Sequence, residues 1–119
     1  MDHAITLPGS PAMVSAARGY VCALLADTPI TYTAALIASE LATNAVCHGG
    51  SGFTLRVQTD DGWARIDVTD PGTRWTSRLP ADDLDDHGRG LAIVAALATR
   101  SGHQRGPDGT TAWAELTWT

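Results

Sequence analysis

The segment ELATNAVCHG, residues 40–49, completes an apolar stretch that starts near Thr31 and has the periodicity of a helix. Glu40 and Asn44 are four residues apart, so on a helix they lie on one face, one turn from each other. A carboxylate beside a carboxamide can hold a divalent cation and orient an attacking oxygen. The neighbours that place this pair in or beside packed surface are apolar: Leu36, Ile37, Ala38, Leu41, Ala42, Ala45 and Val46.

The same helix also permits a purely structural interpretation. Its polar residues form one stripe at helical spacing that could simply face water: Ser39, Glu40, Thr43, Asn44 and Cys47. The helix alone does not decide between a site and a solvated face, so other parts of the chain are needed.

Length and composition indicate one globular domain over residues 1–119. With 44% apolar residues and no apolar run near the roughly 18 residues that cross a bilayer, we expect a soluble protein without membrane contact. The N-terminal MDHAITLPGS lacks a basic region followed by an apolar stretch, so we expect no secretory signal and a cytoplasmic location. Cys22 and Cys47 lie in alanine- and leucine-rich helical patterns, which predicts free thiols with neither a disulfide nor a metal site.

The charge balance restricts the class of partner. Thirteen acidic and eight basic residues give a net charge of −5. Because a duplex-binding surface needs clustered cations, direct nucleic-acid binding is not expected.

The remaining patterns predict short strands and two further helices. Residues 3–7 form a strand, Ser10 is a candidate N-cap with Pro11 at the first helical position, and a helix follows over 11–25. The helix that carries Glu40 should end at the glycines 49–50. Alternating residues predict strands over 53–59 and 63–70, joined by an Asp-Gly turn, with Phe53, Leu55, Val57, Ile66 and Val68 on the covered face.

The second half contains an acidic, turn-rich segment over 73–87, which is typical of a solvated connector or of a functional lid. HGRG at 87–90 then opens a third helix over 91–100, which Gly102 should end. Strands over 101–105 and 110–118 make a second hairpin, with Trp113, Leu116 and Trp118 available for packing.

Two weaker signals accompany the Glu40–Asn44 pair. Glycines 88 and 90 before a helix let backbone N–H groups approach a phosphate, although such glycines more often mark a tight turn. Asp70 at a strand end could bind a base, although an aspartate there is more often a turn residue.

Taken together, ELATNAVCHG on a helix, DPG after a strand (residues 70–72) and HGRGLAIV opening another helix closely resemble the histidine-kinase-like ATPase (GHKL) superfamily. Its members include sensor kinases, gyrase and the bacterial anti-sigma-factor serine kinases. The resemblance covers nearly the whole chain, with GTTAWAEL at 109–116 as the closing strand, and is greatest to the anti-sigma type. It implies an α/β two-layer sandwich, the Bergerat ATP-binding fold, with three helices on one face of a mixed, mostly antiparallel sheet.

The resemblance also implies a role for each matching residue. Asn44 would hold Mg²⁺ on the ATP phosphates, and Glu40 would orient or deprotonate the attacking hydroxyl. Asp70 would accept the adenine amino group, and Gly72 would let the base approach the backbone. Thr111 would support the Asp70 side of the pocket. The phosphates would be wrapped by Gly88, Arg89 and Gly90, with residues 73–87 as the lid.

Three positions depart from the family pattern. Cys47 stands where relatives often carry a cation, Arg74 and Trp75 replace a further glycine after DPG, and the lid is short. His48 matches a common residue, but a histidine that closes a helix is more often a cap than a base.

The resemblance implies a cytoplasmic ATP-dependent serine/threonine kinase that regulates transcription. It would phosphorylate an anti-sigma-factor antagonist and bind a sigma factor, and the relatives suggest a homodimer. The alternative is a non-catalytic ATP-binding regulatory module of the same fold. A structural domain with a decayed site is disfavoured because Glu40, Asn44, Asp70 and the glycine pair are all present.

Overall fold

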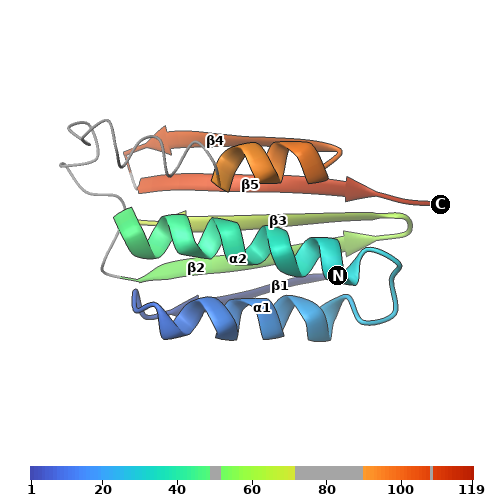
Figure 1. The fold of residues 1–119 in the computed structure, drawn as a ribbon, viewed down its shortest axis with the longest axis horizontal. Coiled ribbons are helices and arrows are strands. Elements are labelled where there is room, and N and C mark those ends of the chain that lie inside the picture. The colour runs from blue at the N-terminus through green and yellow to red at the C-terminus, as the bar shows by residue number, and fades with distance from the viewer. Residues whose placement is uncertain (49–51, 72–89, 108) are drawn as a thin grey trace.

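The computed structural model describes residues 1–48, 52–71, 90–107 and 109–119. The helices form one layer and the strands form the other (Figure 1). The elements are β1 Asp2–Leu7, α1 Ala12–Leu24, α2 Thr31–His48, β2 Phe53–Asp60, β3 Trp63–Asp70, a helix over residues 90–97, β4 Arg100–Gly106 and β5 Gly109–Thr117.

The sheet has five strands in the order β1-β2-β3-β5-β4. All four pairings are antiparallel, so the described sheet contains no parallel pair of the kind that a mixed sheet would include. The helices cover one face, with α2 between α1 and helix 90–97 (Figure 1). The expected two-layer α/β sandwich with three helices on one face is confirmed.

The core lies between the helices and the inner face of the sheet. Phe53, Leu55 and Val57 of β2 and Ile66 and Val68 of β3 are buried there, as their alternation predicts. The buried face of α2 packs on this layer with Ala34, Ala38, Leu41, Ala42 and Ala45. Small alanines let α2 approach the strands closely, and this approach fixes where its polar residues emerge.

The outer face of the sheet is polar and holds a cluster around Trp113. The Arg65 guanidinium lies 4.4 Å from the Trp113 ring centroid and donates to Asp67 (2.8 Å) and Glu115 (3.0 Å). Burial lowers the pKa of Arg65, but the hydrogen bonds and charges of these two carboxylates outweigh it, so the pKa is raised. Arg65 therefore stays charged over the ring.

The third helix ends earlier than the sequence suggests. It stops at residue 97, Arg100 already begins β4, and Gly102 lies inside that strand. A Cβ at position 102 would come within 3.0 Å of Trp113 Cζ2, so this glycine makes room for the indole and does not end a helix.

The start of α1 also differs from the prediction. The cap is Pro11, without a side-chain hydrogen bond, and the helix begins at Ala12. Ser10 contributes its backbone carbonyl, which accepts the Met13 N–H at 2.9 Å. The predicted end of α2 at 49–50 lies outside the described residues.

Among the described residues, no helix combines the length and the apolar character that crossing a membrane requires. Of the two cysteines, Cys22 is half-buried on α1 and Cys47 is exposed on α2.

Candidate functional site

Glu40 and Asn44 meet the start of helix 90–97. Both are half-buried on α2, one turn apart. A methyl group at position 90 would lie 3.5 Å from Asn44 Oδ1 and 3.6 Å from Glu40 Oε2. The fold thus brings a carboxylate, an amide oxygen and a helix N-terminus to one point, although 50 residues separate Glu40 from Gly90 in the sequence.

This arrangement can bind a charged group through complementary chemistry. The first turn of a helix carries partial positive charge and N–H groups without intrahelical partners, which favour an anion. An amide oxygen beside it suits a hard cation such as Mg²⁺. A carboxylate next to both can accept a proton from a hydroxyl. Gly90 keeps the space between these groups free of a side chain.

Asp70 occupies the end of β3 and is buried, with 7% of its surface exposed. Gly109 of β5 packs directly on its backbone, because a Cβ at position 109 would lie 1.9 Å from the Asp70 carbonyl oxygen. Gly109 also has φ +133°, a conformation that favours glycine. The end of β3 and the start of β5 are therefore held together by a contact that only glycine permits.

The strand register assigns the two threonines to opposite faces. Thr111 lies opposite Thr69, and their hydroxyl oxygens are 2.9 Å apart. Thr110 lies opposite Asp70. Since side chains alternate along a strand, Thr110 shares the helix-covered face with Asp70, while Thr111 points to the other face. The family resemblance implies that Thr111 supports the Asp70 side of the pocket, but the strand register places Thr110 opposite Asp70.

Sequence reasoning missed Thr110 and the packing role of Gly109. The usable signal was the alternation of Ala112, Ala114 and Leu116, which are buried and share their face with Thr110. Trp113 obscures this signal, because it is a large apolar residue in the same strand but lies on the outer face.

Several predicted site residues lie outside the described residues. These are Gly72, Gly88, Arg89 and the 73–87 segment.

Comparison with known proteins places the chain in a family. The family model described as histidine kinase-like ATPase domain matches residues 7–116. An uncharacterized protein of Streptomyces coelicolor, SCO4941, is 39% identical over 74 residues, a match that covers 57% of this chain and 70% of that protein.

Two solved structures share the fold. The first contains the RsbU and RsbW domains of Rv1364c from Mycobacterium tuberculosis, with TM-score 0.76, 24% identity, and a match covering 98% of this chain and 32% of that one. The second is the histidine kinase domain of the blue-light activated kinase from Erythrobacter litoralis EL346, with TM-score 0.52, 20% identity, and coverage of 93% and 61%. This chain thus spans about a third of the mycobacterial protein. Since the family model spans nearly all of this sequence, the chain belongs to the histidine kinase-like ATPase domain family.

Proposed function

We propose that the chain is an ATP-binding protein serine/threonine kinase of the anti-sigma regulatory type. The observation that carries the proposal is the meeting of Glu40, Asn44 and the N-terminus of helix 90–97 around Gly90. Family membership supports ATP binding, and the resemblance of the three motifs to anti-sigma kinases supports the finer assignment.

The donor set fits Mg-ATP. Asn44 Oδ1 would hold Mg²⁺, while the start of helix 90–97, with Gly88 and Arg89 before it, would bind the phosphates. Asp70, buried opposite Thr110, would accept a hydrogen bond from the adenine amino group, and Gly72 would let the base approach the backbone. Bound Mg-ATP would supply the phosphoryl group and the charge that neutralises it during transfer.

Glu40 performs the chemical role in this proposal. Its Oε2 lies beside Gly90 and so faces the space where the terminal phosphate would lie. The carboxylate would orient a serine or threonine hydroxyl and remove its proton as the new P–O bond forms and the bond from the γ-phosphorus to its bridging oxygen breaks, with ADP as the leaving group. Because Glu40 contacts the nucleophile and Asn44 the metal, the two residues should fail in different ways.

The proposed partners are an anti-sigma-factor antagonist as phosphate acceptor and a sigma factor, with a homodimer as the proposed assembly. The fold shared with an RsbW-containing structure is consistent with this class.

A phosphotransfer assay tests the mechanism, using an antagonist protein encoded beside this chain as acceptor. Glu40→Gln should lower transfer roughly 10²–10⁴-fold, as expected for a positioned base, while leaving Mg-ATP binding intact. Asn44→Ala should weaken Mg-ATP binding itself. Asp61→Asn removes the same charge in the β2–β3 turn and serves as the matched control.

Transfer at the wild-type rate by Glu40→Gln would show that Glu40 is not the base. Mg-ATP binding without any transfer by the wild type would favour the non-catalytic regulatory module.

A further inference from the structure

Helix 90–97 presents an uncharged surface to solvent. Its exposed residues are all apolar: Ala92, Ile93, Ala95, Ala96 and Leu97. Surface helices normally carry charged or polar residues on their outer side, and a helix that is apolar all round is normally covered. Ile93 and Leu97 are among the exposed large apolar residues of the described structure, with 39% and 37% of their surfaces accessible.

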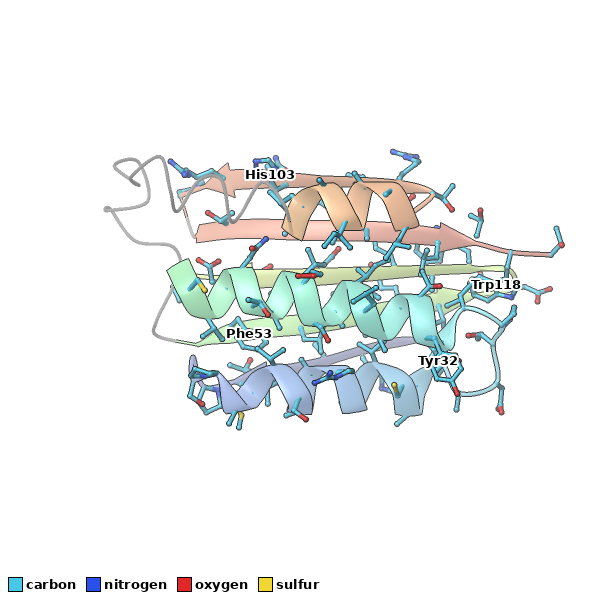
Figure 2. The ribbon with its side chains drawn as sticks, in the orientation of Figure 1. Tyr32, Phe53, His103 and Trp118 are labelled. Atoms are coloured by element: carbon cyan, nitrogen blue, oxygen red, sulfur yellow. The ribbon has the colours of Figure 1, made fainter. Side chains whose placement is uncertain are left out.

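The outer side of α2 continues this surface. Tyr32 projects from the N-terminal end of α2 (Figure 2), and Leu36 follows one turn later with 46% of its surface exposed. Glu40 is the only acidic residue of α2, which contains no lysine or arginine. We call the residues Tyr32, Leu36, Ile93, Ala96 and Leu97 the outer apolar face.

The outer apolar face adjoins the candidate catalytic carboxylate. A Cβ at position 90 would point at the side chains of Glu40 and Asn44, so the side of helix 90–97 that carries Gly90 faces α2. Residues three and seven positions later, Ile93 and Leu97, lie on that same side. On α2, Leu36 precedes Glu40 by one turn. Apolar side chains therefore extend from Glu40 along both helices.

We propose that the outer apolar face docks the phosphate-accepting protein, which would cover it with apolar surface next to its serine or threonine. The proposal rests on the proposed kinase function. A hydroxyl can reach Glu40 only if its protein lies against the surface around Glu40. Within α2 and helix 90–97, the described part of that surface, Glu40 is the only acidic residue and there is no lysine or arginine. The docked protein must be recognised through shape and apolar contact, and must leave after each transfer.

A second copy of this chain is the other possible occupant. A stable dimer through this face would cover Glu40 and exclude the acceptor, so it is incompatible with turnover. The homodimer proposed above would have to use another surface.

Two substitutions test the docking face without touching the site. Leu36→Gln exchanges exposed apolar surface for an amide of similar size. Ala96→Arg places a charge about 9 Å along the helix from Gly90, and a cation is compatible with that end of a helix. Ala16→Arg, at an exposed alanine of α1, is the matched control.

The assay measures phosphate transfer to the antagonist protein at varied concentrations of that acceptor. Separate titrations measure the affinity for the acceptor and the affinity for Mg-ATP. For Leu36→Gln and Ala96→Arg we expect the acceptor KM and Kd to rise about tenfold or more, with kcat and Mg-ATP affinity unchanged. Ala16→Arg should match the wild type.

Unchanged acceptor KM and Kd in both variants would overturn the docking proposal. So would a dimer that Ala96→Arg converts to monomer, because the face would then be an interface between copies. If the wild type binds the antagonist but transfers no phosphate, the kinase function fails, while weakened binding by the variants still supports the docking face.

Discussion

Gly109 joins the buried Asp70 to the neighbouring strand through a contact of backbone on backbone. A Cβ at this position would lie 1.9 Å from the Asp70 carbonyl oxygen and 2.7 Å from the Pro71 carbonyl carbon. Gly109→Ala must therefore displace the end of β3 or the start of β5, and its φ of +133° adds strain. We expect a loss of more than about 1 kcal/mol in the free energy of unfolding, with weaker Mg-ATP binding.

Urea unfolding and nucleotide titration measure both effects. Gly19→Ala is the matched control, since a Cβ at this helical position has no neighbour within 4 Å. It should stabilise α1 by roughly 0.5–1 kcal/mol. If Gly109→Ala keeps both the stability and the nucleotide affinity of the wild type, the close packing of Gly109 on Asp70 is not required.

Gly90 poses the opposite case, in which the fold tolerates a side chain but the site does not. The new methyl group would meet Asn44 Oδ1 and Glu40 Oε2 at 3.5 and 3.6 Å, which are ordinary contact distances. Gly90→Ala should therefore unfold at the wild-type urea concentration or slightly above it. Since the methyl group would occupy the space between the two oxygens and the helix start, we expect Mg-ATP affinity to fall about tenfold, an amount equivalent to about 1.4 kcal/mol. Unchanged affinity would place the phosphates elsewhere.

At the scale of the strand, the pairing of β3 with β5 decides which threonine serves the site. Thr110→Val removes the hydroxyl opposite Asp70 that we propose supports its carboxylate, and loss of one hydrogen bond should weaken ATP binding by roughly 2–10-fold. Thr111→Val removes a hydroxyl that meets Thr69 on the outer face, so its ATP affinity should equal that of the wild type. Calorimetric titration of the two variants compares them directly. A larger effect at position 111 than at position 110 would contradict the face assignment.

The edge strand β1 is tied to β2 by a pair of hydrogen bonds between two half-exposed side chains. Arg56 donates to both carboxylate oxygens of Asp2, at 2.9 and 2.6 Å. This hydrogen bonding, more than the charge itself, lowers the pKa of Asp2 below 3.8. A carboxyl with a lowered folded-state pKa stabilises the fold fully above pH 3.8, and the stabilisation disappears as the pH falls through the lower folded-state value.

Asp2→Asn should therefore unfold at a slightly lower urea concentration than the wild type at neutral pH, because exposed ion pairs stabilise little. The difference should vanish well below pH 3.8. Asp61→Asn controls for the loss of one negative charge. A difference that grows on acidification would show that Arg56 does not hold the Asp2 carboxylate.

At the scale of the whole molecule, periodicity predicted the elements and the covered face of the sheet but not the contacts between distant segments. Alternation placed Phe53 and Ile66 in the core, and the four-residue spacing placed Glu40 beside Asn44. The approach of Gly90 to both follows from the packing of two helices on one sheet, which spacing along the chain does not encode. The roles given to these residues came from the family resemblance, and they stay predictions.

The errors share the same origin. A glycine after an apolar run commonly stops a helix, yet Gly102 lies under a tryptophan from the neighbouring strand. The family resemblance points to Thr111, whereas the residue opposite Asp70 is Thr110, because strand register depends on the partner strand. Both required knowledge of which strand pairs with which.

In the proposed site, Asp70 and the Asn44–Gly90 region bind the two ends of one ATP molecule. Calorimetric titration with Mg-ATP and Mg-GTP tests it most directly, on the wild type and on Asp70→Asn, which keeps the size of the side chain but is a weaker acceptor. We predict that the wild type prefers Mg-ATP and that Asp70→Asn loses roughly 1.5–3 kcal/mol of binding free energy, the contribution of a charge-assisted hydrogen bond. Either of two results would contradict the proposed site: a wild type that binds no Mg-ATP, or an Asp70→Asn variant whose affinity for Mg-ATP is within a factor of two of the wild-type value.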